Sequence, residues 1–299
     1  MELDRILSTS FKLGDYTLSN RIVLAPMSCL SQERNLFQPK IVNYYAQKAS
    51  AGLIVTDPTL IAPLAGFQNC PGIYSRQQVK KWRQITEEIH DRNGKIFLQL
   101  WYCDDVTATC LLGETLPTPT KSITYTNAKE DLSAVAKLFR RAAQNALRAD
   151  FDGVEIHAAF GYLVDRHLQY STKLDREVEQ LKQLLIRIIE EVASVWDEER
   201  VGVRIAPEKA FSGANVSSLI DIFCDLSDVF NFYDIAYVHL IESAPDLFDP
   251  QVFLALSSLL RSIYHGTIIS NCQDDLKKAQ LAIAKGNADL ISFDKLIAC

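Results

Sequence analysis

Short continuous runs of apolar residues alternate along the chain with longer segments whose apolar residues recur every three or four positions. The runs are typical of β-strands buried on both faces, and the spaced segments are typical of amphipathic helices. Eight runs predict strands, at residues 21–27, 52–59, 95–101, 153–159, 201–207, 233–242, 266–271 and 288–294. Seven spaced segments predict helices, at residues 41–50, 75–93, 131–150, 178–199, 215–230, 250–265 and 274–286.

This alternation of strands and helices predicts an α/β fold, a (β/α)8 TIM barrel formed by a single domain over residues 1–299. An open doubly wound sheet is the alternative, and it is less favoured because no Gly-x-Gly-x-x-Gly motif follows a predicted strand. Residues 11–20 predict a hairpin that caps the barrel.

The sequence ends at Cys299, shortly after the eighth predicted strand, so we expect the eighth helix to be missing. The barrel face that it would cover is then exposed, capped by the N-terminal segment, or covered by a second copy of the chain in a homo-oligomer.

Composition narrows the class of protein. The net charge of −6 and the lack of basic runs argue against nucleic acid as a partner. No apolar run reaches membrane-spanning length and no signal peptide precedes the first strand, which predicts a cytoplasmic protein away from membranes. The seven cysteines are scattered and form no Cys-x-x-Cys pair, which predicts free thiols and no metal site.

Polar residues at the predicted strand ends are the candidates for chemistry. In a parallel barrel the carboxyl ends of the strands face the ligand. His157 ends the fourth strand and Tyr162 follows five residues later, so the pair could hold a carbonyl group and deliver a proton. A buried core histidine beside a packing tyrosine explains the same pattern equally well.

Arg204 lies within an apolar strand, where a permanent positive charge needs an anionic or strongly accepting partner. That partner is either a ligand or a strand carboxylate such as Glu155 or Asp57. The third strand adds Gln99 and Trp101 to this polar set.

Several segments, in the order in which they occur, match a known family. The segments are LSNRIVLAPMS at 18–28, YYAQKASAGLIVTD at 44–57, PGIYSRQQVKKW at 71–82, GKIFLQLW at 94–101, FDGVEIHAAFGYLVDRHL at 151–168, RVGVRIAP at 200–207 and GNADLISFDK at 286–295. Together they resemble the Old Yellow Enzyme family of flavin-dependent ene-reductases (NADH:flavin oxidoreductases). The resemblance implies a flavoprotein whose (β/α)8 barrel binds FMN.

The resemblance also implies roles for single residues around the flavin. Pro26, Met27 and Ser28 match the segment that lies against the flavin ring. Gln99 matches the side chain that hydrogen-bonds the pyrimidine edge of the ring. Arg204 matches the cation that stabilises negative charge on the reduced flavin, a role that electrostatics supports in a dry pocket.

At the substrate, His157 matches a residue that grips the carbonyl oxygen, and Tyr162 matches the proton donor. Trp101 would line the substrate pocket. Hydride would pass from NADPH or NADH to FMN and then to the β-carbon of an activated, α,β-unsaturated carbonyl alkene. Phe160 replaces the second carbonyl-gripping residue of the family, and losing one such donor costs about 2.7–4 kcal/mol in the transition state. We therefore expect altered or weakened activity.

The phosphate end departs further from the family pattern. Residues 271–273 (Asn-Cys-Gln) replace a glycine-rich turn, and Asp294 with Lys295 replaces a Gly-Arg pair. Glycines let backbone N–H groups point at a phosphate and arginine binds it bidentately. Asn271 and Lys295 are what remains to bind phosphate, while Asp294 adds repulsion. The chain is also poor in glycine overall, with 12 in 299 residues.

Three functions therefore stay open. The first is an FMN-dependent oxidoreductase of the ene-reductase type. The second is a barrel that no longer uses flavin and employs His157 and Tyr162 as acid and base in an isomerase or lyase reaction. The third is a non-catalytic interaction protein, which binds a partner through the face left by the missing helix.

Overall fold

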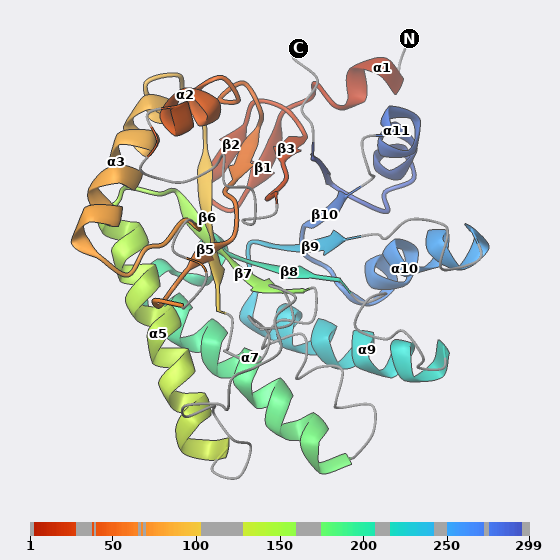
Figure 1. Ribbon diagram of the computed structural model, residues 1–299. Coiled ribbons are helices and arrows are strands. Elements are labelled where there is room, and N and C mark those ends of the chain that lie inside the picture. Colours follow the sequence, from red (N-terminus) through yellow and green to blue (C-terminus); the bar gives the residue numbers. More distant parts are fainter. Residues whose placement is uncertain are drawn as a thin grey trace.

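The computed structural model describes residues 3–27, 38, 40–64, 67, 70–102, 128–159, 175–206, 216–241, 250–271 and 275–294. Eight parallel strands form a closed ring, in the order β4, β3, β11, β10, β9, β8, β7 and β6, and β6 pairs again with β4 (Figure 1). The strands are β3 (Ile22–Leu24), β4 (Leu53–Val55), β6 (Ile96–Trp101), β7 (Gly153–Ala158), β8 (Val201–Ile205), β9 (Tyr237–Ile241), β10 (Ile268–Asn271) and β11 (Leu290–Phe293). The predicted TIM barrel is confirmed, and the open-sheet alternative is wrong.

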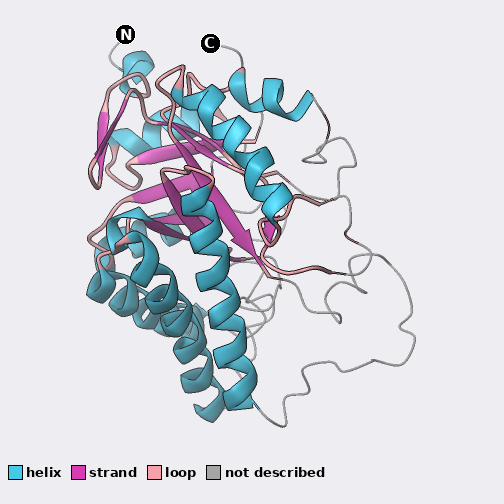
Figure 2. Cartoon of the chain, turned by 90° about the vertical axis from the view of Figure 1, so that its left-hand side faces the viewer, coloured by secondary structure: helices cyan, strands magenta, loops and turns pink. Residues whose placement is uncertain are grey.

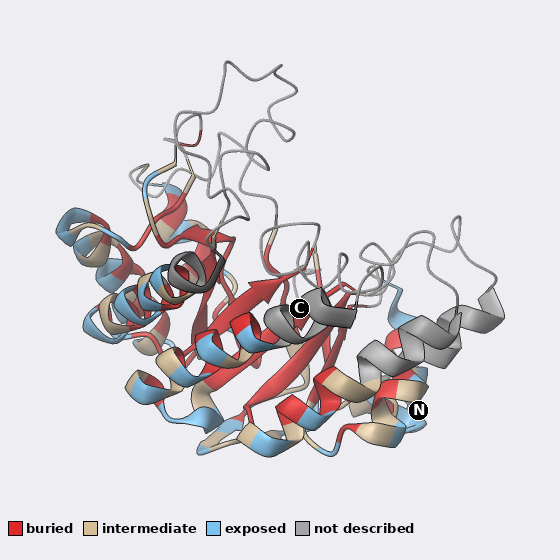
Figure 3. Cartoon of the chain, turned by 90° about the horizontal axis from the view of Figure 1, so that it is seen from below, coloured by how far each residue is buried: buried red, intermediate tan, exposed pale blue. Residues whose placement is uncertain are grey.

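Each of the seven predicted helices is present. They are α2 (Lys40–Ala46), α3 (Arg76–His90), α5 (Ala128–Arg148), α7 (Asp175–Trp196), α9 (Val216–Tyr233), α10 (Pro250–Ile263) and α11 (Leu276–Ala284). The helices lie outside the barrel (Figure 2), and the barrel strands are buried along their length except at Ile22, the first residue of β3 (Figure 3). A short strand, β5 (Thr59–Leu60), extends the sheet beside β6 and was not predicted as a separate element.

Helix α3 illustrates how the sequence sets the helix ends. Ser75 and Gln78 form a capping box in which the Gln78 N–H donates to Ser75 Oγ and the Ser75 N–H donates to Gln78 Oε1. The apolar positions that follow place Trp82, Ile85 and Ile89 in the core between helix and barrel. The spacing of apolar residues therefore determines which face of the helix packs on the sheet.

Most helices return to the next strand through one residue with a positive φ angle. Asn93, Asp150, Asp197, Asp234 and Gly286 occupy these turns, with φ between 47° and 73°. Glycine is the usual residue in this conformation, and asparagine and aspartate tolerate it better than other side chains. Aspartate and asparagine at four of these turns account for part of the low glycine content.

The lower half of the barrel interior, at the amino-terminal ends of the strands, is apolar and is closed by the predicted hairpin. Strands β1 (Phe11–Leu13) and β2 (Tyr16–Leu18) pair antiparallel, and Leu13 and Leu18 pack against the inward-facing residues of the barrel. Phe97 and Tyr237 fill this layer with ring centroids 5.8 Å apart. A Cβ on Gly153 would lie 2.5 Å from Phe97, so this strand requires glycine for packing.

The short N-terminal helix α1 (Leu3–Ile6) lies beside α11 (Figure 1). Leu7, directly after it, is buried in the main core. The N-terminal segment thus covers part of the barrel surface near α11. The positions after Asp294, where an eighth helix would follow, lie outside the described residues, so the missing helix and the homo-oligomer stay predictions.

Two further expectations concern the chain as a whole. None of the helices within the described ranges is long and apolar enough to cross a membrane. Cys224 is a free thiol, as predicted for this residue, and five of the other cysteines lie outside the described part of the chain.

Candidate active site

A polar layer lies above the apolar lower half of the barrel interior. Alternate residues of a strand face the same side, so the residues two positions beyond the inward-facing Phe97, Gly153, Gly202, Tyr237 and Leu290 also face inward. They are Gln99, Glu155, Arg204, His239 and Ser292, and each is buried. Five polar side chains from five strands therefore meet inside the barrel.

Gln99 is held at both its backbone and its side chain. Its N–H donates to Thr56 Oγ1 over 3.1 Å, and its Nε2 donates to Glu155 Oε1 over 2.6 Å. Its Oε1 is buried and accepts no hydrogen bond from the residues that the structure describes. A buried acceptor of this kind is costly unless a ligand supplies the donor.

Glu155 connects Gln99 with His239 on the other side of the layer. Its Oε2 lies 2.9 Å from His239 Nδ1, and His239 Nε2 lies 2.8 Å from Ser292 Oγ. Burial alone would raise the pKa of Glu155, but His239, the charge of Arg204 and the Gln99 hydrogen bond hold that pKa below its usual range. Burial lowers the pKa of His239 more strongly than Glu155 raises it. The layer thus contains an ionised glutamate beside a neutral histidine.

Arg204 lies between two histidines in the strand register, with His157 on β7 and His239 on β9. Its Nη1 donates to the carbonyl oxygen of Pro26 over 3.2 Å. This contact ties the end of β3, which carries the predicted flavin-facing segment, to the cation. The same charge acts on Glu155, one of the two carboxylates considered as partners for Arg204.

The segment after β3 is fixed by a second contact. The N–H of Met27 donates to Asp57 Oδ1 over 3.0 Å, and Asp57 follows strand β4. Pro26 and Met27 therefore lie at the same end of the barrel as Arg204. Ser28, the third residue predicted for this segment, lies outside the described residues.

His157 lies at the carboxyl end of β7 and is only 2% exposed. Burial, followed by the positive charge of Arg204 and by His239, lowers its pKa well below the usual value. A neutral imidazole at this position carries a single N–H donor. Its predicted companions Phe160 and Tyr162 fall among the residues that the structure leaves undescribed.

Trp101 ends strand β6 and is fully buried. Its ring packs against Leu60 and lies 5.7 Å from the ring of Phe67, measured between centroids. The side chain thus joins a small apolar cluster above the polar layer. Its predicted place in the substrate pocket stays a prediction.

The ends of β10 and β11 lie beside each other, as the predicted phosphate site requires. Asn271 pairs with Ser292 in the strand register, and its Nδ2 donates to Asp294 Oδ1 over 3.0 Å. A carboxylate therefore occupies the point where the loops after strands seven and eight of a TIM barrel often bind phosphate. Lys295, predicted to offset it, lies beyond the described part of the chain.

Sequence reasoning missed His239 and Ser292 and considered Glu155 only as a partner for Arg204. A single polar residue in an apolar strand has no motif of its own. Counting in steps of two from Gly153 and Tyr237 would have placed Glu155 and His239 on the inward face. Among the described residues no group of histidine, cysteine, aspartate or glutamate is arranged to hold a metal ion, and the prediction of no metal site stays open for the rest.

Comparisons of the sequence and of the structure with known proteins both find flavin-dependent oxidoreductases. The model of the NADH:flavin oxidoreductase / NADH oxidase family matches residues 7–297. The 12-oxophytodienoate reductase 1 of Oryza sativa subsp. japonica is 30% identical over an alignment that covers 97% of this chain and 82% of the relative. A probable flavin mononucleotide-dependent alkene reductase of Leishmania infantum is 27% identical, over 94% of this chain and 84% of its own length.

Solved structures agree. The old yellow enzyme from Trypanosoma cruzi superposes with a TM-score of 0.78 at 27% identity, covering 96% of this chain and 88% of the other. Morphinone reductase in complex with tetrahydroNAD gives a TM-score of 0.79 at 27% identity, with 96% and 86% covered. The chain therefore belongs to the NADH:flavin oxidoreductase / NADH oxidase family and is a member of the Old Yellow Enzyme group within it.

Proposed function

We propose that this protein is an FMN-dependent oxidoreductase that uses NADPH or NADH to reduce an alkene activated by a neighbouring carbonyl group. The similarity to the rice and Leishmania reductases supports this class of reaction. The observation that carries the proposal is the polar layer inside the barrel, where Gln99 offers a buried acceptor and Arg204 a buried cation, and where both act on Glu155. These are the groups that the pyrimidine edge of a flavin requires.

The described residues fit the ring end of FMN. Gln99 Oε1 would accept from the N–H of the ring edge, and Arg204 would supply a fixed positive charge in a dry site, where it costs no reorganisation. Pro26 and Met27 would lie against the ring, because Arg204 and Asp57 hold this segment in place. FMN, when bound, supplies the hydride chemistry that no side chain of the protein can perform.

His157 and Tyr162 are the proposed substrate residues. His157 is neutral, so it would donate one hydrogen bond to the substrate carbonyl oxygen without adding a charge. Tyr162 would deliver the proton to the carbon next to that carbonyl. Phe160 cannot donate a hydrogen bond, so we propose that simple enones are reduced slowly and that the preferred substrate has an acceptor group of another kind.

The phosphate end supports a second candidate function. Asn271 and Asp294 place a carboxylate at the ends of β10 and β11, which does not suit a phosphate dianion. A barrel that works without FMN, with His157 and Tyr162 as acid and base on a small carbonyl compound, is consistent with this feature. Gln99 and Arg204, at the expected position of the flavin ring, favour the flavin enzyme. Asp294, at the expected position of the phosphate, favours the alternative.

The experiment that separates them uses the purified protein incubated with FMN and desalted. The proposal predicts a retained flavin absorbance band that bleaches under anaerobic NADPH or NADH and returns slowly when 2-cyclohexenone, a simple enone, is added. Tyr162→Phe should keep the bleaching and slow the return, because only the second step needs its proton. A protein that retains no flavin, yet converts carbonyl compounds and loses that activity in Tyr162→Phe, would establish the alternative.

A further inference from the structure

A continuous chain of hydrogen bonds crosses the barrel interior beneath the proposed flavin site. It runs from Ser292 on β11 through His239 on β9 and Glu155 on β7 to Gln99 on β6, with distances of 2.8, 2.9 and 2.6 Å. All four side chains are 0% exposed. Water cannot exchange into such a chain easily, so its hydrogen-bond directions are fixed by the groups themselves.

The direction of each bond follows from the charges. Glu155 is ionised, so both of its carboxylate oxygens only accept. His239 must therefore carry its proton on Nδ1, and as a neutral ring it offers Nε2 as an acceptor to the Ser292 hydroxyl. The Gln99 amide must turn its NH2 group toward Glu155. A flipped Gln99 would bring two oxygens within 2.6 Å of each other with no proton between them.

The order serine, histidine, carboxylate is also that of a hydrolytic triad, but this chain cannot act as one. Ser292 is fully buried, and its hydroxyl donates to His239 at the end of the chain. A nucleophile needs access to a substrate carbonyl and an oxyanion site beside it. Deep in the barrel, the chain can only orient what lies at its other end, which is Gln99.

We propose that Ser292, His239 and Glu155 are positioning residues that lock the Gln99 amide with its oxygen facing the ligand, so that the site selects a flavin whose pyrimidine edge carries an N–H donor. This inference rests on the proposed function, because it specifies which ring edge the flavin site accepts. Glutamine alone could present either its oxygen or its NH2 group. Glu155 removes that freedom.

The test compares the affinity for FMN with the affinity for 3-methyl-FMN, in which a methyl group replaces the imide hydrogen. The wild-type protein should bind FMN about tenfold more tightly or better, which is the effect of one well-placed hydrogen bond. In Glu155→Gln the amide of residue 155 lets Gln99 take either orientation, so this ratio should fall toward one. General damage to the site weakens both ligands alike and leaves the ratio unchanged.

Matched controls keep the outcome interpretable. Glu191→Gln makes the same chemical change outside the barrel, where Glu191 of α7 pairs with Arg140 of α5, and should keep the wild-type ratio. Ser292→Ala should lower the ratio less than Glu155→Gln, because His239 still donates to Glu155. It also serves as the readout if Glu155→Gln does not fold.

A second measurement needs no flavin. Nitrogen-15 NMR of the imidazole rings should show the His239 proton on Nδ1 in the wild-type protein. A proton on Nε2 overturns the proposed bond directions. Equal binding of FMN and 3-methyl-FMN by the wild type, or a wild-type ratio in Glu155→Gln, overturns the inference and leaves the proposed function standing. A wild type that binds neither flavin overturns both.

Discussion

Two histidines of this protein each lie 2.9 Å from a buried carboxylate oxygen, and their pKa values are shifted in opposite directions. His239 contacts Glu155 inside the barrel, where the pKa of the imidazole is lowered. His90, the last residue of α3, contacts Asp152 at the base of the barrel, where the hydrogen bond to Asp152 raises the imidazole pKa. The contact is the same, so the surroundings decide the charge.

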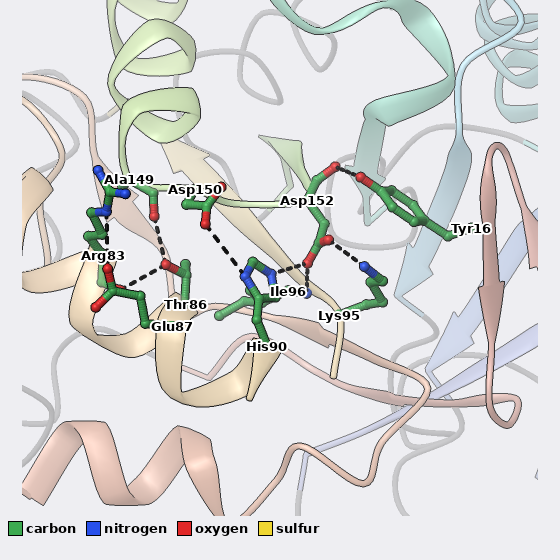
Figure 4. Close-up of polar contacts among 10 residues, drawn as sticks. All are labelled: Tyr16, Arg83, Thr86, Glu87, His90, Lys95, Ile96, Ala149, Asp150 and Asp152. Carbon is green, nitrogen blue, oxygen red and sulfur yellow. Dashed lines mark hydrogen bonds and ion pairs between the residues drawn. The ribbon is translucent and has the colours of Figure 1, made fainter. Parts of the chain in front are cut away.

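The basal cluster (Tyr16, His90, Lys95, Asp150 and Asp152) is a network of hydrogen bonds and ion pairs centred on Asp152 (Figure 4). Asp152 accepts from His90, from Lys95 Nζ over 2.9 Å and from the Ile96 N–H over 2.9 Å. Burial would raise the pKa of Asp152, but these hydrogen bonds outweigh it and hold the pKa below its usual value. Tyr16 of the hairpin donates to the Asp152 carbonyl oxygen, so the basal cluster connects helix α3, the barrel and the hairpin.

The difference lies in solvent access. The side chain of His90 is 29% exposed and can take up a proton from water, whereas His239 is completely enclosed. For a fully buried imidazole, the desolvation cost of the charged form exceeds the stabilisation from one neighbouring carboxylate, so its pKa falls. The interior chain therefore keeps a fixed pattern of donors and acceptors, which suits ligand recognition, while the basal cluster titrates and contributes to stability.

The largest effect should come from removing the interior carboxylate. Glu155→Ala removes the acceptor of Gln99 and of His239 together with the negative charge that acts on Arg204, and each buried donor left unsatisfied costs about 1–3 kcal/mol. Urea unfolding should show this loss in the free energy of unfolding. Glu191→Ala breaks the partly exposed ion pair between α7 and Arg140 of α5 and should cost about 1 kcal/mol or less. Similar losses in the two variants would contradict the idea that Glu155 is a structural centre of the barrel.

Asp152→Asn tests the basal side of the comparison. The amide keeps the shape but weakens the bonds to His90 and Lys95, and hydrogen bonds to charged groups contribute about 1.5–3 kcal/mol. We expect a loss in that range in the same urea experiment, smaller than that of Glu155→Ala because water reaches the basal cluster. A larger loss than in Glu155→Ala would reverse the ranking of the two regions.

The pH dependence of stability should separate the two histidines. The raised pKa of His90 means that its contribution is complete below the ordinary value of 6.5 and is lost as the pH rises through the folded-state pKa. The lowered pKa of His239 has the opposite sign, so its contribution is complete above 6.5 and is lost as the pH falls below it. His90→Gln should remove only the decline above pH 6.5, as measured by urea midpoints at several pH values. A decline that persists in this variant would show that another group causes it.

The smallest effect should come from Asp150, the outer member of the basal cluster. It lies 3.7 Å from His90 Nδ1, its side chain is 62% exposed, and its φ angle is +64°. Glycine suits this backbone conformation better, and the exposed ion pair contributes little. Asp150→Gly should raise the free energy of unfolding by about 0.5 kcal/mol, which should appear as a slightly higher melting temperature. A lower melting temperature would mean that the contact with His90 outweighs the backbone strain.

The fold could be predicted from the sequence, whereas the contacts inside the barrel could not. The strands were visible because each is a continuous apolar run, and the helices because their apolar residues recur at helical spacing. The bonds of His239 to Glu155 and to Ser292 join residues 84 and 53 positions apart, and no local pattern encodes such pairs. His90 and Asp152 are 62 positions apart, and their contact likewise depends on the closure of the barrel.

The candidate site was predicted in two ways. Gln99, His157 and Arg204 came from a resemblance to a family, and the structure brings these three together at the carboxyl ends of neighbouring strands. The orientation of Gln99 could not be predicted, because it depends on the charge of a glutamate that is set by burial and by three neighbours. The low glycine content was interpreted as a weakness of the phosphate site, and part of it reflects aspartate and asparagine at helix ends.

The measurement that tests the account most directly is an equilibrium titration of FMN, followed by fluorescence quenching, with the wild-type protein and Gln99→Leu. Leucine is close in size to glutamine and removes the buried acceptor. We predict saturable binding of one FMN per wild-type chain, and binding weakened about 10- to 100-fold in Gln99→Leu with an unchanged circular dichroism spectrum. Failure of the wild type to bind FMN, or equal affinity in the two proteins, would contradict the claim that the polar layer of the barrel is built to hold the flavin ring.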